Sequence, residues 1–174
     1  KDADQMQKDM DALSSRLDRI LGKAIVCHED KPLPEILGEK LRKLNLTLST
    51  AESCTGGNIA HQITSVPGSS EYFMGSVVAY SNDVKMKMLN VSSDVLDEHG
   101  AVSEPTVKQM VCGVCSMMGT DCAIATSGIA GPGGGTSLKP VGTVWISVKM
   151  GERIKTLCKH FPGSRDRVID RATT

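Results

Sequence analysis

Aromatic residues and excess charge are both scarce in this sequence. Its 174 residues include one Trp, two Tyr and two Phe, and its 20 Lys and Arg balance 20 Asp and Glu. Aromatic platforms on which nucleic-acid bases stack are therefore few, and bulk charge attracts neither a phosphate backbone nor an anionic membrane. We expect no nucleic acid and no membrane among the partners of this chain.

Long apolar runs are missing as well. No stretch approaches the roughly 20 apolar residues that a helix needs to cross a bilayer. The N-terminal part also lacks the basic flank, apolar run and small-residue cleavage site of a signal peptide. From these two observations we expect a cytoplasmic protein.

The six cysteines would allow three disulfides, but a chain of this length without a signal sequence more often keeps its thiols reduced and packed in the core. We expect core packing for Cys112 and Cys115 in a helical pattern, and for Cys122 and Cys158 in strand patterns. The CxxC spacing of Cys112 and Cys115 suits redox and metal sites. However, no second CxxC and no suitably spaced His pair completes a zinc set, so we expect no metal and no cofactor.

Strand patterns alternate with helix patterns along most of the chain. Helical spacing and capping signals predict helices over residues 33–44, 58–64, 84–89, 92–100, 103–118 and from 164 onwards. Apolar and β-branched runs predict strands over residues 46–48, 73–80, 121–127, 143–150 and 153–161. Gly151 and Glu152 suggest a hairpin between the last two strands, which are then antiparallel. We predict an α/β fold, a three-layer α/β/α sandwich with a mixed sheet, preceded by an N-terminal helix.

Residues 1–23 form a charged segment with a helical pattern of their own. Its apolar positions follow the alternating four-three spacing of a heptad, at Met6, Met10, Leu13, Leu17 and Ile20. Such a helix either packs on its own domain or acts as a linker or self-association helix. A short strand from Ala24 to Cys27 and a Pro-containing break follow. We expect residues 1–30 to be an N-terminal helix and connector, residues 31–174 to be the main domain, and the protein to be a homo-oligomer.

Polar and reactive side chains gather where three predicted strands end. The stretch Leu46–Gly57, LTLSTAESCTGG, is a buried strand that breaks into a sharp turn with Ser53 and Cys54 before a helix begins. The strand ends after Ala79 and Ala125 add further groups, namely Tyr80, Ser81, Asn82, Lys85, Thr126, Ser127 and the glycines from Gly128 to Gly135. Ligands of α/β sheets bind beyond the carboxyl ends of strands, and the free N–H groups of a helix N-terminus attract anions. We therefore predict one site at this edge.

A serine nucleophile paired with a lysine base is the chemistry that these residues favour. A Ser hydroxyl needs a neighbour that takes its proton, and none of the four His residues falls at these strand ends. Lys85 is the best-placed base, because desolvation lowers the pKa of a lysine. Tyr80 would relay or orient the proton, and backbone N–H groups after Ser53 or around Gly128 would hold an oxyanion. This set predicts acyl transfer, most simply amide or ester hydrolysis.

Each of these residues also has a purely structural interpretation. Ser53 could cap a helix, and Lys85 could be a solvated lysine on a helix face. Tyr80 could be a strand-end aromatic, and the glycines could serve turn geometry alone. Cys54 is a rival nucleophile, although it lacks a His partner and a Cys is easily buried beside a turn. The joint location of these residues is what favours a site.

The Gly-rich loop after Ser127 matches no nucleotide-binding motif. GIAGPGGGTSLK is neither GxxxxGK[ST] nor the GxGxxG of a dinucleotide-binding first strand. It could still wrap a phosphate. Lys139 and Arg165 supply cations in this loop or just downstream of it. Arg165 falls in the first turn of a predicted helix, where a cation opposes the helix dipole, so anion binding would explain its placement.

Six motifs, in this order, carry a resemblance to a known family. They are AESCTGG (51–57), AYSNDVK (79–85), HGAVSEP (99–105), SGIAGPGGG (127–135), KPVGTVW (139–145) and FPGSRD (161–166). Over roughly residues 33–174 the chain resembles the C-terminal domain of competence/damage-inducible CinA proteins, a domain shared with bacterial nicotinamide mononucleotide deamidases.

The resemblance implies an amidohydrolase of pyridine nucleotide salvage, which converts nicotinamide mononucleotide and water to nicotinic acid mononucleotide and ammonia without a metal. The family's nucleophilic Ser falls on Ser53, and its Tyr and Lys fall on Tyr80 and Lys85. Ser127 would help to stabilise the oxyanion, and Arg165 or Lys139 would hold the phosphate. Ser164 stands where the family usually has Asp. The predicted substrate-binding residues are Thr55, Gly56, Gly57, Asn82, Thr126, Gly128, Lys139 and Arg165.

Two other functions remain open at this point. One is a non-catalytic nucleotide-binding or regulatory module of a competence/damage-inducible protein, whose partner domain performs the chemistry. In two-domain CinA proteins, the resemblance implies, an N-terminal domain similar to molybdopterin-binding proteins acts on ADP-ribose, and residues 1–30 look like the tail of the connector to such a domain. The other is an assembly role through the N-terminal helix.

Overall fold

A computed structural model describes residues 2–22 and 25–174 of this chain. The chain divides into two compact units, Lys1–Pro32 and Leu33–Thr174. The first unit holds the expected N-terminal helix, α1 (Ala3–Leu21), which begins where the Asp2 carboxylate accepts from the backbone N–H of Asp4. No residue of α1 is buried, and its five heptad positions are 43–68% exposed. The short strand expected at Ala24–Cys27 begins outside the described residues, and its described part, residues 25–27, forms no strand.

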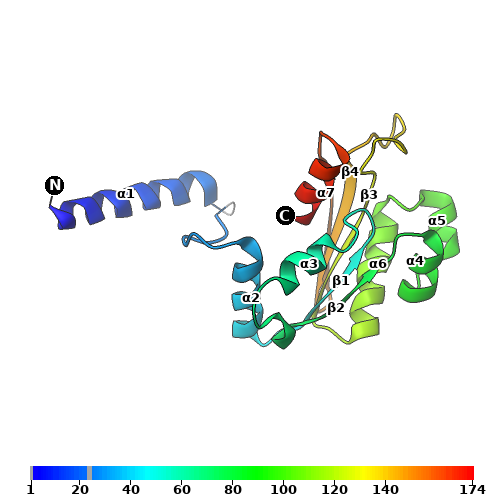
Figure 1. The fold of residues 1–174 in the computed structure, drawn as a ribbon, viewed down its shortest axis with the longest axis horizontal. Coiled ribbons are helices and arrows are strands. Elements are labelled where there is room, and N and C mark those ends of the chain that lie inside the picture. The colour runs from blue at the N-terminus through cyan, green and yellow to red at the C-terminus, as the bar shows by residue number, and fades with distance from the viewer. Residues whose placement is uncertain (1, 23–24) are drawn as a thin grey trace. The chain divides into compact units, whose positions relative to one another are not determined.

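A five-stranded mixed sheet forms the centre of the second unit, with the strand order β2-β1-β3-β4-β5 (Figure 1). Its strands are β1 (Leu48–Glu52), β2 (Phe73–Val78), β3 (Cys122–Gly128), β4 (Thr143–Met150) and β5 (Arg153–His160). β1 runs parallel to β2 and β3, whereas β4 pairs antiparallel with β3 and β5. The predicted hairpin at Gly151 is thus present, and the predicted α/β class with a mixed sheet is confirmed.

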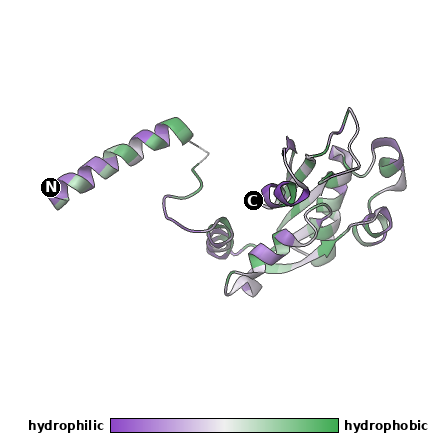
Figure 2. Ribbon diagram, turned by 45° about the horizontal axis from the view of Figure 1, so that its top comes forward, coloured by the Kyte–Doolittle hydropathy of each residue, from purple (hydrophilic) through white to green (hydrophobic). Residues whose placement is uncertain are grey.

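Helices cover both faces of this sheet. The first four helical segments of this unit in chain order are α2 (Leu33–Leu44), α3 (Asn58–Thr64), the short 3-10 helix Ser69–Glu71 and α4 (Asn82–Leu89). The others are α5 (Ser93–His99), α6 (Glu104–Met118) and α7 (Arg165–Thr173). The buried face of α6 packs with Ala51 and Ala125, while Leu48 and Cys122 pack with α2 and α3. Figure 2 shows how the apolar residues concentrate on the strands.

Alternation along the strands decides which layer each side chain meets. In β1, Ala51 points towards α6, whereas Leu48 belongs to the cluster beneath α2 and α3. Because successive residues of a strand point to opposite faces, Ser53 continues the Ala51 face and Cys54 continues the opposite one. Cys54 accordingly packs in a third cluster with Val144 of β4 and Val168 of α7.

Two strands, β1 and β2, differ from the prediction by two or more residues at their ends. β1 begins at Leu48 and continues to Glu52, rather than ending at Leu48, because its small polar residues form ladders with β2 and β3 on both sides. β2 ends at Val78 instead of Tyr80. Pairing in the centre of a sheet overrides the weak strand propensity of Ser, Ala and Glu.

All six cysteines are free. Cys115 and Cys122 are buried as expected, and Cys112 is partly buried. The prediction of core packing was wrong for Cys158, which is exposed because β5 is the edge strand of the sheet. In residues 2–22 and 25–174, no helix is long and apolar enough to cross a membrane.

Candidate active site

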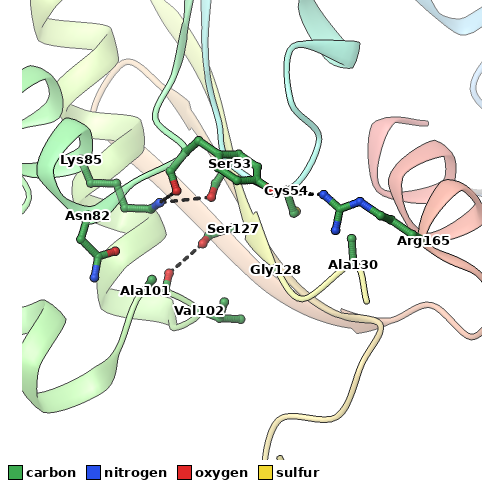
Figure 3. Close-up of a pocket in the computed structure, with 11 residues that line it drawn as sticks. Ser53, Cys54, Asn82, Lys85, Ala101, Val102, Ser127, Gly128, Ala130 and Arg165 are labelled. Atoms are coloured by element: carbon green, nitrogen blue, oxygen red, sulfur yellow. Dashed lines mark hydrogen bonds between the residues drawn. The ribbon is translucent and has the colours of Figure 1, made fainter. Parts of the chain in front are cut away.

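A cavity of about 190 Å³ lies at the carboxyl ends of the three parallel strands. Ser53 follows β1, Tyr80 comes two residues after β2, and Ser127 is the penultimate residue of β3. The remaining lining residues come from the turn after β1, from α4, from the loop before α6, from the end of β3 and the loop after it, and from α7 (Figure 3); they are Cys54, Asn82, Lys85, Ala101, Val102, Gly128, Ala130 and Arg165. The sheet edge therefore gathers groups from three motifs into one cavity, as the topology of parallel strands requires.

Ser53 is held at the end of β1 by the backbone rather than by a helix. Its N–H donates to the carbonyl of Thr126 at 3.0 Å, which continues the β1–β3 ladder by one residue, and its own carbonyl accepts from Gly56 N at 3.2 Å. The next helix, α3, begins only at Asn58, with Gly57 in the capping position. Ser53 is thus not a helix cap, and its 8% exposed side chain lines the cavity.

Glu52 occupies the helix end that the sequence suggested for an anion. Its fully buried carboxylate accepts from the backbone N–H groups of Gly57 (3.0 Å), Ile59 (3.1 Å) and Ala60 (2.8 Å). A carboxylate placed this way satisfies the orphan N–H groups of α3 and is stabilised by the helix dipole. The expectation that this helix end receives an external anion was therefore wrong. A charged residue inside a buried strand, just before Gly-Gly and a helix, was the signal for this arrangement.

Lys85 reaches Ser53 from α4, where it is only 1% exposed. The Ser81 hydroxyl accepts from Val84 N at 3.2 Å and fixes the start of this helix, one turn before Lys85. The lysine Nζ lies 3.1 Å from Ser53 Oγ (Figure 3). It also lies 2.7 Å from the Ala79 carbonyl oxygen and 3.4 Å from the Tyr80 carbonyl oxygen. The solvated-lysine interpretation is excluded.

Burial lowers the pKa of the Lys85 ammonium, because removal from water disfavours its charged form. A neutral amine carries two N–H donors and one lone pair. The two carbonyl oxygens can take both donors, which leaves the lone pair for the hydroxyl proton of Ser53. The site thus fits a neutral lysine that accepts a proton from serine.

Tyr80 and Arg165 form the outer side of the cavity. Arg165 Nη2 donates to the Tyr80 hydroxyl at 2.9 Å, and Nη1 donates to the carbonyl of Gly131 at 2.8 Å. The Tyr80 hydroxyl therefore contacts the arginine, and it is the backbone carbonyl of Tyr80 that faces Lys85. Arg165 is the first residue of α7 and anchors the Gly-rich loop.

Ser127 lies deep in the cavity and is 1% exposed. Its hydroxyl donates to the Ala101 carbonyl oxygen at 2.7 Å. The neighbouring Thr126 points to the other face of the sheet, where its hydroxyl pairs with that of Thr55 at 2.8 Å. Gly128 follows, and a Cβ there would lie only 3.0 Å from Cys54 Sγ and 2.8 Å from the Thr143 carbonyl oxygen, so the close strand packing requires glycine.

Some of the site residues predicted from the sequence lie together in this cavity, and others lie outside it. Ser53, Tyr80, Asn82, Lys85, Ser127, Gly128 and Arg165 line one cavity. Five predicted substrate-binding residues do not line it, namely Thr55, Gly56, Gly57, Thr126 and Lys139. Lys139 donates instead to the His99 carbonyl at the end of α5, at 2.8 Å. Sequence reasoning missed the apolar wall of Ala101, Val102 and Ala130, because small apolar residues carry no chemical signal.

Cys54 is an unfavourable nucleophile in this setting. Burial raises the pKa of its thiol to about 11, so the reactive thiolate is scarce near neutral pH. Its side chain is 6% exposed and packs in an apolar cluster. Among residues 2–22 and 25–174, no group of three His, Cys, Asp or Glu side chains is placed to hold a metal ion.

Comparison with known proteins places this chain in a family. The model of the CinA C-terminal domain matches residues 30–174. The chain belongs to the CinA C-terminal domain family. A CinA-like protein of Chloroherpeton thalassium is 49% identical over 148 residues, which cover 83% of this chain and 34% of that protein. For a CinA-like protein of Gloeothece citriformis, the identity is 53% over 116 residues, covering 67% and 28%.

Solved structures of the family share this fold. The competence damage-inducible protein A of Klebsiella pneumoniae superposes with a TM-score of 0.79 at 35% identity, covering 81% of this chain and 88% of that one. A CinA superfamily protein of Escherichia coli gives a TM-score of 0.80 at 30% identity, covering 88% and 92%. This chain thus spans about a third of the length of the curated relatives it matches, but most of the length of these two solved chains.

Proposed function

We propose that this domain is an amidohydrolase that hydrolyses nicotinamide mononucleotide to nicotinic acid mononucleotide and ammonia. The observation that carries the proposal is the buried Lys85 Nζ, 3.1 Å from Ser53 Oγ. A lysine at this position can take the serine proton, and burial lowers the pKa of its ammonium, which favours the neutral form that acts as a base. The identity of the substrate is supported by the family to which the chain belongs.

The reaction begins when Ser53 Oγ attacks the carboxamide carbon and its proton passes to Lys85 Nζ. The tetrahedral intermediate collapses as Lys85 returns the proton to the amide nitrogen, so the C–N bond breaks and ammonia leaves. Water then adds to the ester of Ser53 and loses a proton to Lys85. Lys85 passes this proton to Ser53 Oγ as the C–O bond to serine breaks, and the carboxylic acid so formed loses its proton to the solution and leaves as the carboxylate. The two Lys85 carbonyl contacts hold the amine in place through both steps.

Arg165 is the group we propose for the substrate phosphate. Its guanidinium sits at the outer side of the cavity, where the Tyr80 hydroxyl and the Gly131 carbonyl fix its plane. A planar guanidinium suits bidentate contact with a phosphate. Asn82 lines the same cavity and supplies a neutral amide for the sugar hydroxyls. Lys139 is less suited, because it does not line this cavity and its ammonium donates to the His99 carbonyl instead.

Ammonia release from nicotinamide mononucleotide tests the proposal. Ser53→Ala and Lys85→Met should each lower kcat by at least about a thousandfold, because the reaction needs both the nucleophile and its base, and the raised pKa of the Cys54 thiol makes it a poor replacement for Ser53. Matched controls are Ser65→Ala, which removes an exposed hydroxyl on the His61 carbonyl, and Lys87→Met, which removes an exposed lysine on α4. Both controls should release ammonia at the wild-type rate.

Three results would overturn the proposal. Wild-type protein that binds the nucleotide in calorimetry without releasing ammonia would favour the non-catalytic nucleotide-binding module. Full activity in Ser53→Ala, with loss in Cys54→Ala, would transfer the nucleophile to the thiol. Loss of binding alone in Lys85→Met, with kcat retained, would remove its role as base.

A further inference from the structure

The Ser127 hydroxyl can offer only an acceptor to the cavity. Its single proton is donated to the Ala101 carbonyl oxygen at 2.7 Å, and a hydroxyl carries one proton and two lone pairs. What remains for a ligand is lone-pair density. A partner at this point must therefore bring an N–H or O–H donor, and an oxyanion would meet the negative end of the hydroxyl dipole.

The carbonyl that takes this proton is itself held in place. Ala101 follows Gly100, whose carbonyl accepts from the hydroxyls of Ser103 (2.9 Å) and Thr106 (2.8 Å) at the start of α6. Ser103 also caps that helix by accepting from Thr106 N. These hydrogen bonds tie the loop that contains Ala101 to the start of α6. The carbonyl oxygen that accepts the Ser127 proton therefore belongs to a loop that is held in place.

The position of Ser127 relative to Ser53 matches the size of a carboxamide. The parallel register pairs Glu52 with Thr126, and the next two residues, Ser53 and Ser127, therefore lie side by side on one face. Neighbouring strands are about 4.8 Å apart, a spacing that leaves room for a carbon bonded to Ser53 Oγ and its nitrogen beside Ser127 Oγ. Both side chains line the same cavity (Figure 3).

We propose that Ser127 is a specificity-determining residue that selects primary carboxamides by accepting an N–H of the scissile amide. This inference rests on the proposed function and replaces the oxyanion role that the sequence suggested for Ser127. One N–H of the amide donates to Ser127 Oγ while Lys85 protonates the amide nitrogen. Ser127 thereby orients the nitrogen that leaves as ammonia. An ester has no such donor, and the carboxylate product sets its own lone pairs against those of Ser127, which favours its release.

Binding measurements on an inactive background give the first test. The test is to measure, by calorimetry, the affinity of Ser53→Ala and of Ser53→Ala/Ser127→Ala for nicotinamide mononucleotide and for nicotinic acid mononucleotide. Loss of the acceptor should weaken the amide roughly tenfold and tighten the carboxylate by several-fold. These opposite directions are the signature, because a damaged fold would weaken both ligands.

Kinetics on amide and ester give the second test. Ser127→Ala should lower kcat/KM for nicotinamide mononucleotide roughly tenfold to a hundredfold, and that for the methyl ester of nicotinic acid mononucleotide less than about threefold. Ser127→Thr should restore amide turnover. Ser49→Ala is the matched control, because its buried hydroxyl pairs with that of Thr120 at the far end of β1, and it should leave the amide-to-ester ratio unchanged.

The outcomes separate the two proposals. Equal losses for amide and ester in Ser127→Ala, or weaker binding of both ligands to the double variant, would overturn the role of Ser127 while leaving the amidase intact. A wild-type protein that turns over neither amide nor ester would overturn the proposed function itself. In that case, weaker binding of the amide and tighter binding of the carboxylate to the double variant than to Ser53→Ala would still assign the acceptor role to Ser127.

Discussion

Lys85 shows how a residue acquires a role from its surroundings. On the surface of α4, a lysine contributes little to stability, as in the exposed i,i+4 pair of Lys87 with Asp83. Lys85, two residues earlier, points into the core and has its pKa lowered by burial. Ser53 shows the same dependence, because its hydroxyl is activated only by the amine that packs against it.

The lowered pKa of Lys85 predicts the pH dependence of the proposed amidase. The base must be neutral, and a depressed pKa places its neutral form at lower pH than the ordinary lysine value of about 10.4. We therefore expect kcat/KM for nicotinamide mononucleotide to rise with pH through that depressed pKa and then level off. Lys85→Arg should abolish both the activity and this limb, because an arginine stays charged.

Ammonia release between pH 6 and pH 10 measures this profile. A limb at the ordinary lysine pKa would contradict a desolvated base, and so would a flat profile.

The lowered pKa of Lys85 also has a consequence for stability. Between the lowered folded pKa and the unfolded value, the unfolded chain binds more protons, so the free energy of unfolding rises with pH in that window. Urea titration of Lys85→Met should lack this rise.

At the scale of elements, the active site depends on how closely α4 approaches α6. Leu89 ends α4, and its backbone carbonyl lies directly against Gly113 in the middle of α6. A side chain at Gly113 would collide with that carbonyl, which is backbone and has nowhere to move. This glycine therefore lets α4 sit low enough on α6 for Lys85 to reach Ser53.

Gly113→Ala should damage both stability and activity. The extra methyl forces α4 away from α6, with a cost of about 1–3 kcal/mol in the free energy of unfolding, and it moves Lys85 away from Ser53. Gly133→Ala is the matched control, because nothing lies within 4 Å of a Cβ there. Urea denaturation and ammonia release measure the two effects. Wild-type activity in a folded Gly113→Ala protein would show that the position of α4 tolerates this displacement.

At the scale of the whole molecule, all the residues of the proposed site belong to the second unit. The cavity is lined by residues 53–165, whereas the first unit ends at Pro32. The family match likewise begins at residue 30. The apolar positions of α1 are exposed, and their heptad spacing suggests a linker or a self-association helix, which stays a prediction.

Deletion of residues 1–32 should leave a folded domain that releases ammonia at the full rate. Light scattering on the same sample measures the expected homo-oligomer. We expect a smaller particle than the full chain gives, because the exposed positions Met10, Leu13 and Leu17 are removed. Loss of activity in a folded, truncated protein would contradict the assignment of the site to residues 33–174, and an unchanged oligomer would remove α1 from the interface.

The sequence by itself determined the elements of this domain and the edge at which its reactive residues gather. Periodicity and caps located the helices within a few residues, because the spacing of apolar side chains and the residues Ser81 and Ser103 act locally. It also pointed to Ser53 and Lys85, since parallel strands end on one side of a sheet.

Only the tertiary structure decided which of these residues meet. The pleat of β1 turns Ser53 towards α4 and Cys54 into an apolar cluster, and this depends on a strand end four residues beyond the predicted one. Glu52 fills the helix end that local sequence left open, and Lys139 bonds a distant carbonyl. The Ser127 proton is committed to Ala101, 26 residues away in the chain. Each of these outcomes is a hydrogen bond or contact between distant segments, and local patterns carry no information about which partner lies within reach.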